Sequence, residues 1–330
     1  TEIRDLRISG GFAAIRQNGA VGLLRVRRVT INTTATGSAT PRGVDLTGAG
    51  LDLDDVDITI NGNSNSCAGV LVNNTSALGV RATNLRINLT NCADPRGLSG
   101  APAVLHVGEL LLRGADITLT GSVGSTTSIR LTYFSRITLE DVSVRQDSTA
   151  SLSVPEDEGI ALFCTDIQLS DVRVDARSNR PGVGLSLNSA VAGGKVVARD
   201  VEVTTGGPSS SFRGANFYSH LVDVDGMRIR TQGNADYALV HSTAGAVGRF
   251  RGVHVEKSST TVGVSAGPTT TTTFMHGSVR GPGTGILRSA TGIVELFSSQ
   301  VEGAIPAPDP NFRCASSYSA AFAQLAGCTF

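Results

Sequence analysis

The chain has 330 residues, is 40% hydrophobic, and carries 28 basic and 28 acidic side chains, so its formal net charge is zero. This balance gives no electrostatic basis for binding nucleic acid or an anionic membrane surface. No apolar run approaches the roughly 20 residues that a membrane-spanning helix needs. The chain is long enough to bury a sizeable core, and we expect neither a nucleic-acid partner nor a membrane span.

A short phrase recurs from one end of the chain to the other. It consists of an apolar–x–apolar pair, a turn residue and a second apolar–x–apolar pair, with clear copies at Leu51–Ile58, Ile137–Val144 and Ile167–Val174. The alternation predicts a short strand on each side of the turn. Such self-similarity predicts a solenoid, because no repeat can bury its apolar face without a neighbour.

The residue just before the second apolar pair marks the turn of each repeat. Asp, Asn and Gly dominate this position, and these residues tolerate left-handed or bridging backbone conformations. The marks predict about twelve coils. They fall at Asp5, Arg28, Asp55, Asn84, Gly114, Asp141, Asp171, Asp200, Gly226, Gly252, His276 and Ser298.

A second phrase, Gly–apolar–x–apolar, lies halfway between most marks, for example at Gly43–Leu46, Gly69–Val72 and Gly159–Leu162. The two phrases together give three short strands per coil. This layout resembles that of the secreted bacterial right-handed parallel β-helix proteins, a superfamily that includes pectate lyases, polygalacturonases and phage tailspikes. The resemblance covers nearly the whole chain. It implies an all-β fold, a single-stranded right-handed parallel β-helix solenoid over residues 1–303.

Residues 304–330 form a Pro-rich linker and a C-terminal cap in this interpretation. Tyr318, Phe322 and Leu325 recur at helical spacing between two cysteines, which predicts a short helix tied by a Cys314–Cys328 disulfide. A tail of this kind resembles Cys-to-Cys C-terminal segments of bacterial secreted and surface proteins.

The other cysteines have different predicted roles. Cys67 and Cys92 lie in corresponding loops of adjacent coils, so a bridge between them and two free thiols are both open. Cys164 alternates with Leu162 and is expected to be a buried core thiol. Two candidate bridges favour an oxidising compartment: the periplasm, the cell surface or the medium. Because Thr1 already lies within a repeat, we expect a mature or trimmed product.

Outward side chains of successive coils should stack in columns. One column alternates in charge, which predicts a ladder of ion pairs that stabilises the coil register. Its members are Arg7, Thr30, Asp57, Arg86, Asp116, Ser143, Arg173, Glu202, Arg228 and His254. A second column begins Arg25, Asp52, Arg81. The run Glu156–Glu158 is expected to be a solvated loop.

Two acidic patches break the alternation. The first consists of Asp52, Asp54, Asp55 and Asp57, flanked by Arg25, Arg81 and Arg86. Carboxylate oxygens suit calcium, and arginines can hold uronate carboxylates through paired hydrogen bonds. By resemblance to the lyases of the superfamily, Asp52, Asp54 and Asp55 are candidate calcium ligands, and Arg25, Arg81 and Arg86 are candidate binding residues. No other cofactor is expected.

The second patch combines carboxylates with imidazoles: Asp200, Glu202, Asp223, Asp225, His220, His254 and His276. Glycoside hydrolysis needs two carboxyl groups at about 5 Å for retention or about 6.5–9.5 Å for inversion. Outward residues of nearby coils could supply either distance, so Asp223, Asp225 and His254 are candidate catalytic residues. The full signature set of polygalacturonases is absent.

Two functional hypotheses follow. The first is a secreted or surface-displayed solenoid with a structural, adhesin-like or carbohydrate-binding role, whose partner is a polysaccharide or cell-surface glycan. The alternative is a polysaccharide lyase or glycoside hydrolase that acts on an extended glycan. Both remain open at this stage, as does a trimeric assembly like that of the tailspikes.

Overall fold

The computed structural model describes residues 1–325 except 11, 20–21, 36–39, 64, 76–77, 103–106, 150–156, 190, 192, 208–211, 234–235, 260–261, 308, 320 and 322. The described residues form β-strands and connections, without a helix. None of them therefore belongs to a helix long and apolar enough to cross a membrane.

The strands of the first sheet are β1 (Glu2–Ser9), β3 (Leu23–Thr34), β5 (Gly50–Asn61), β7 (Val80–Thr90), β9 (Glu109–Ser122), β11 (Arg136–Ser148), β13 (Asp166–Ser178), β15 (Lys195–Gly206), β17 (Leu221–Thr231), β19 (Val247–Lys257), β21 (Thr271–Met275), β22 (Ser278–Arg280), β24 (Ile293–Phe297), β25 (Gln300–Val301) and β26 (Phe312–Ala315). Those of the second sheet are β2 (Ala13–Asn18), β4 (Arg42–Thr47), β6 (Cys67–Thr75), β8 (Pro95–Pro102), β10 (Thr127–Thr132), β12 (Asp157–Phe163), β14 (Gly182–Ser189), β16 (Phe212–Ser219), β18 (Tyr237–His241), β20 (Val262–Ala266) and β23 (Ile286–Arg288).

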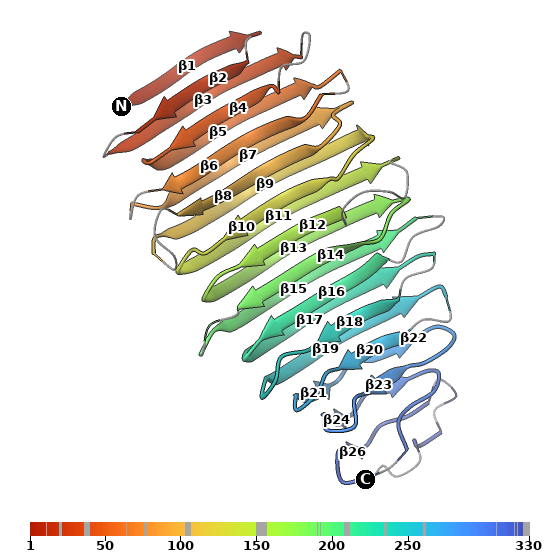
Figure 1. Cartoon of the computed structure of the whole chain (residues 1–330). Coiled ribbons are helices and arrows are strands. Elements are labelled where there is room, and N and C mark those ends of the chain that lie inside the picture. The colour runs from red at the N-terminus through yellow and green to blue at the C-terminus, as the bar shows by residue number, and fades with distance from the viewer. Residues whose placement is uncertain are drawn as a thin grey trace.

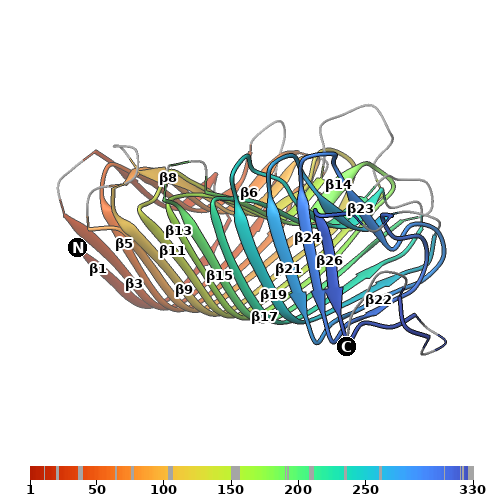
Figure 2. The ribbon, with the colours of Figure 1, turned by 90° about the horizontal axis from the view of Figure 1, so that it is seen from below.

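The chain alternates between the two sheets, and neighbouring strands within each sheet pair in parallel. Each turn of the chain therefore adds one strand to each sheet. Figure 1 shows the strands stacked in chain order from the N-terminus to the C-terminus, and Figure 2 shows the sheets as two layers. The fold is a parallel β-solenoid, which confirms the predicted class.

The solenoid has about nine turns rather than the twelve expected from the marks. Nine strands of 11–14 residues, β3 to β19 in odd-numbered steps, form the regular part. The three excess marks belong to incomplete coils. Asp5 lies in the 8-residue β1 at the open end of the sheet. His276 and Ser298 lie where the long strand is interrupted, between β21 and β22 and between β24 and β25.

The marks are the bends of the long strands. Asp55, Asp141 and Asp171 have φ values of 54°, 52° and 56°, in the left-handed region, and the other predicted marks also have positive φ. The two short strands expected on either side of each mark are therefore one continuous strand with a bend. Each coil has two strands in place of the predicted three.

Side chains alternate between the interior and the solvent along each strand. In β5, Leu53, Val56 and Ile58 are buried while Asp55 is exposed. The glycine of the second phrase allows the two layers to approach each other. A Cβ added to Gly69 would lie 2.6 Å from Ile87 Cγ2 and 2.7 Å from the carbonyl oxygen of Gly97. Only glycine fits there without movement of the opposite layer.

The interior toward the C-terminal end contains an aromatic stack. The ring centroids of Phe217 and Phe250 lie 5.5 Å apart, and those of Phe250 and Phe274 lie 5.0 Å apart. The fully buried His241 packs against Phe250, and its Nδ1 lies 2.8 Å from Thr272 Oγ1. Burial lowers the pKa of His241 from 6.5 to about 4, because the interior disfavours the imidazolium ion.

One part of the expected solvated run is buried instead. Asp157 is completely inaccessible, accepts a hydrogen bond of 2.7 Å from the Thr126 backbone N–H, and is hydrogen-bonded to Ser178 Oγ. Burial raises the pKa of Asp157. The prediction was wrong for this residue because Asp157 begins β12 on the inward face. Glu156 lies outside the described residues.

The structure decides between the two alternatives for Cys67 and Cys92 and confirms that Cys164 is a buried thiol. Cys67 and Cys92 form a disulfide, and Cys164 is a buried free thiol. Burial raises the pKa of Cys164 to about 12. Cys314 is disulfide-bonded, and its expected partner Cys328 lies outside the described residues.

The predicted C-terminal helix is wrong for the described residues. Cys314 lies in β26, which pairs in parallel with β24, and Tyr318 forms an antiparallel bridge with Gln324. An open sheet edge offers unpaired backbone groups to the next segment, and this segment takes up that pairing in place of a helix. Phe322 is not described.

Substitution of a bend residue should test the backbone constraint. Asp141 is exposed and has a φ of 52°, so Asp141→Val should lower the free energy of unfolding by about 1–2 kcal/mol, because a β-branched residue strains this conformation. Asp141→Gly should be tolerated. Urea unfolding of both variants measures the difference, and equal stability of the two would contradict the role of the bend.

Acid should weaken the fold through His241. Its folded-state pKa of about 4 lies below its unfolded value of 6.5, so the unfolded chain takes up the proton more readily. Stability should therefore fall as the pH drops from 6.5 toward 4, by about 3 kcal/mol in full. His241→Gln, which does not titrate, should show a flatter pH dependence of its urea midpoint than the wild type. Parallel pH profiles would refute this assignment.

Candidate functional site

The predicted columns of outward side chains exist. Thr30, Asp57, Arg86 and Asp116 are paired in register across β3, β5, β7 and β9, and Arg173, Glu202, Arg228 and His254 across β13, β15, β17 and β19. Within the first of these columns, Arg86 Nε donates to Asp57 Oδ1 at 2.5 Å. Other ion pairs also join neighbouring coils, such as Arg113 with Glu140 and Arg136 with Asp166. Exposed pairs of this kind contribute up to about 1 kcal/mol each.

The first acidic patch is held by arginines. Asp52 lies 3.9 Å from Arg25 and 3.7 Å from Arg27, and Asp55 lies 3.4 Å from Arg86. Arg81 is in register with Asp52 without an ion pair in the described part of the chain. The described residues contain no group of three or more His, Cys, Asp or Glu placed to hold a metal ion.

Among the described residues, the connection between β7 and β8 near the patch is short. The chain after Asn88 is mostly strand, because β7 continues to Thr90 and β8 begins at Pro95. Asp54, the remaining candidate ligand, is half-buried on β5. The candidate calcium ligands therefore all lie on β5, and the described residues around them add no further ligand.

The bend at Gly226 separates the candidate catalytic residues of the second patch. Asp223 and Asp225 precede the bend on β17, whereas His254 follows the next bend, at Gly252, on β19. Arg199 lies 2.7 Å from Asp223, and Arg251 lies 3.6 Å from Asp223 and 3.4 Å from Asp225. The structure thus brings the two carboxylates together with arginines and places His254 on the other side of the bend.

His254 lies in a groove on the outer face of the first sheet, directly after the bends. Two hollows of about 480 and 370 Å³ share Arg228 and His254. We call their combined surface the crease groove. It is lined by Asp171, Arg173, Asp200, Val201, Glu202, Gly226, Met227, Arg228, Gly252, His254, Glu256, His276, Gly277, Ser278, Arg280, Ser298, Ser299, Gln300 and Tyr318.

The polar groups of the crease groove divide into two sets. Arg230, next to the groove, lies 3.5 Å from Glu202 and 2.9 Å from Glu256, so it occupies both carboxylates. By contrast, Arg173 and Arg228 form no ion pair or side-chain hydrogen bond within the described residues. They are in register with Glu202 on either side, but its carboxylate is turned toward Arg230. The groove therefore offers two uncommitted guanidinium groups.

Further groove residues add hydrogen-bonding groups. His254 Nδ1 lies 2.9 Å from Ser278 Oγ, and Arg280 donates to Gln300 at 3.0 Å. Tyr318 provides an aromatic ring at the C-terminal end of the groove. Arg228 and His254 were predicted members of the ladder column, whereas Tyr318 was predicted to lie in a C-terminal helix and not at a site.

Comparisons with known proteins give no relative. A scan against protein-family models and searches of curated proteins and solved structures find no match to this chain. The resemblance to the pectate-lyase-like superfamily is therefore limited to the parallel β-solenoid architecture, and a shared architecture does not assign an activity.

Removal of Arg251 should test whether Asp223 and Asp225 are structural. Arg251→Met should lower stability by about 0.5–1 kcal/mol at low salt, because two carboxylates lose a common partner, and by less at 1 M salt. Arg249→Met is the matched control, since Arg249 is exposed on the same strand and forms no ion pair in the described part of the chain. A salt-independent loss, or an equal loss in the control, would contradict the ladder.

Proposed function

We propose that this chain is a glycan-binding β-solenoid in which an extended saccharide lies along the crease groove. The observation that carries the proposal is a pair of arginines, Arg173 and Arg228, that line the groove without an ion pair among the described residues. Other outward arginines are paired with carboxylates, for example Arg28, Arg86 and Arg113. This supports the structural or carbohydrate-binding role expected from the sequence over the enzymatic one.

The chemistry of the groove suits sugar hydroxyl groups. Guanidinium groups donate several hydrogen bonds in a fixed plane, and carboxylate, hydroxyl and amide groups supply acceptors. Glu256, Ser278 and Gln300 provide such acceptors beside His254. The Tyr318 ring can pack against a sugar face and keep its hydroxyl group in water.

The dimensions of the groove suit an extended chain. Bend positions of six successive coils line it, from Asp171 to Ser298. Parallel strands lie about 4.8 Å apart, so these positions extend over roughly 24 Å. The groove is shallow, so an extended polymer can lie in it.

The ion pairs formed by the carboxylates favour a binding role over a catalytic one. Glu202 and Glu256 share Arg230, and Asp223 and Asp225 share Arg251. These carboxylates are thus held in ion pairs between neighbouring coils.

A secreted, periplasmic or cell-surface location is part of the proposal. The Cys67–Cys92 disulfide supports it, because structural disulfides persist mainly in oxidising compartments. In such a location the partner would be a polysaccharide or a cell-surface glycan, and the resemblance to secreted bacterial β-helix proteins agrees with this assignment.

The test is a glycan array followed by calorimetry with the best ligand. Arg228→Ala should weaken binding about tenfold or more without a change in Tm, because the side chain has no ion-pair partner to lose. Arg7→Ala is the matched control: Arg7 is exposed in the same column at the other end of the solenoid. Equal losses in both variants, or no binding by the wild type, would reject the groove as a binding site.

A second readout separates binding from catalysis. The glycans bound on the array are incubated with the protein, with and without calcium, and examined for new reducing ends and for unsaturated products. We expect neither. Products that disappear on Asp223→Asn would support a hydrolase, and unsaturated products that require calcium would support a lyase at Asp52, Asp54 and Asp55.

A further inference from the structure

A separate hollow of about 470 Å³ lies on the outer face of the second sheet, over β4 to β10. Three arginines from different coils line it, Arg42, Arg96 and Arg130, together with the hydroxyl groups of Ser66, Ser125 and Thr127. We call it the arginine hollow. It belongs to the sheet opposite the crease groove and shares no residue with it.

The register of the coils explains why the arginines surround an open space. Arg42 pairs with Ala68, Ala68 with Arg96, and Arg96 with Thr127. Arg42 and Arg96 are therefore two coils apart, about 9.6 Å, with the small Ala68 between them. Arg130 follows on β10. Small side chains between long ones leave a floor that a ligand can occupy.

Two of the three arginines have a carboxylate partner, Arg42 with Asp45 and Arg130 with Glu158, whereas the third has none within the described residues. Arg96 is exposed and has no ion pair or side-chain hydrogen bond among the described residues, since its register neighbours are Ala68 and Thr127. Arg42 donates to Asp45 at 2.7 Å through one terminal nitrogen, while its buried Nε has no partner. Arg130 lies 3.7 Å from Glu158.

The one carboxylate in the lining is already in use. Asp94 Oδ1 accepts a hydrogen bond of 2.9 Å from the Ser125 backbone N–H, and its Oδ2 accepts one of 3.2 Å from Ser66 Oγ. Both oxygens thus hold the connections at the edge of the hollow. The other residues that line the hollow are cationic or neutral.

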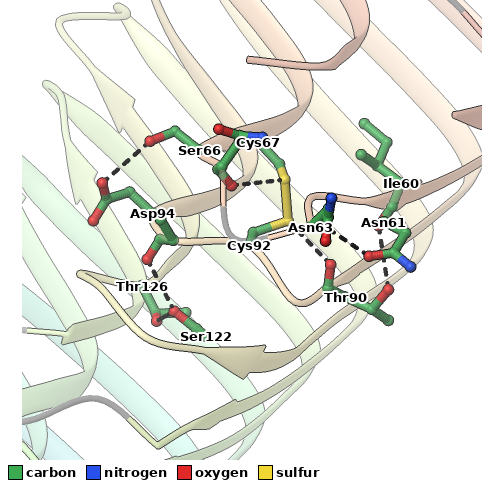
Figure 3. Close-up of a disulfide and its surroundings, with 12 residues drawn as sticks. Ile60, Asn61, Asn63, Ser66, Cys67, Thr90, Cys92, Asp94, Ser122 and Thr126 are labelled. Atoms are coloured by element: carbon green, nitrogen blue, oxygen red, sulfur yellow. Dashed lines mark hydrogen bonds between the residues drawn. A yellow bond between two sulfur atoms is a disulfide. The ribbon is translucent and has the colours of Figure 1, made fainter. Parts of the chain in front are cut away.

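The edge of the hollow is covalently fixed. The Cys67–Cys92 disulfide joins the two coils that supply Ser66 and Asp94, and Cys67 itself lines the hollow. Figure 3 shows the disulfide beside the Ser66–Asp94 hydrogen bond. A fixed edge reduces the conformational entropy that a ligand must remove on binding.

We propose that the arginine hollow binds an oxyanion: a carboxylate, sulfate or phosphate group. Arginine pairs with such groups through two parallel hydrogen bonds, and Arg96 is the uncommitted guanidinium at the centre of the set. The volume of the hollow admits a small molecule or one charged unit of a larger ligand, and the hydroxyl groups of Ser66, Ser125 and Thr127 supply further contacts.

The experiment is an NMR titration of the labelled full chain with sodium sulfate, sodium phosphate and sodium glucuronate, at ionic strength held constant with sodium chloride. We expect saturable shifts in the amide signals of Ser66, Thr127 and Arg96 with at least one of these anions. The Kd values for the three anions show which oxyanion the hollow prefers.

Variants complete the test. Arg96→Ala should raise Kd about tenfold or more. Arg96→Lys should bind more tightly than Arg96→Ala, because lysine keeps the positive charge but cannot form the two parallel hydrogen bonds of arginine. Arg249→Ala, an exposed arginine of the first sheet without an ion pair among the described residues, should leave Kd unchanged. Shifts that do not saturate, or an equal loss in Arg249→Ala, would overturn the proposal.

Discussion

Parallel hydrogen bonding between successive coils is the constraint on which the rest of this structure depends. Because every long strand bends at the same place and pairs in register with the next, each outward position of a coil lies over its counterpart. Asp57 therefore meets Arg86, and Arg228 lies between Glu202 and His254. The surface chemistry is organised as columns along the solenoid, and a residue's function depends on its neighbours one coil away.

This arrangement explains why charged residues have different roles at equivalent positions. Some carboxylates form an ion pair with an arginine in the next coil and stabilise the register, as Glu140 does with Arg113. Where the neighbours are small or neutral, as around Arg96, the guanidinium group stays available. The proposed binding surfaces are thus positions at which the ladder is incomplete.

The fold was largely predictable because its signals are local. A left-handed residue between two alternating apolar pairs specifies a bend, and this was visible at Asp55 and Asp141 without any structure. The C-terminal segment was not predictable in the same way, since the spacing of Tyr318 and Leu325 also suits a helix. Pairing of β26 with the open edge of β24 outweighed that local preference.

The sequence by itself determined the strand alternation, the bend positions, the solenoid class and the alignment of the main charge columns. Only the tertiary structure decided which charges pair, because side chains choose among partners on adjacent coils within a few ångströms. Glu202 turns to Arg230 and not to Arg228, and Asp223 is separated from His254 by the bend. Backbone conformation depends on residues a few positions apart in the sequence. The candidate sites are formed by side chains that lie more than twenty residues apart in the sequence and meet only when the coils stack.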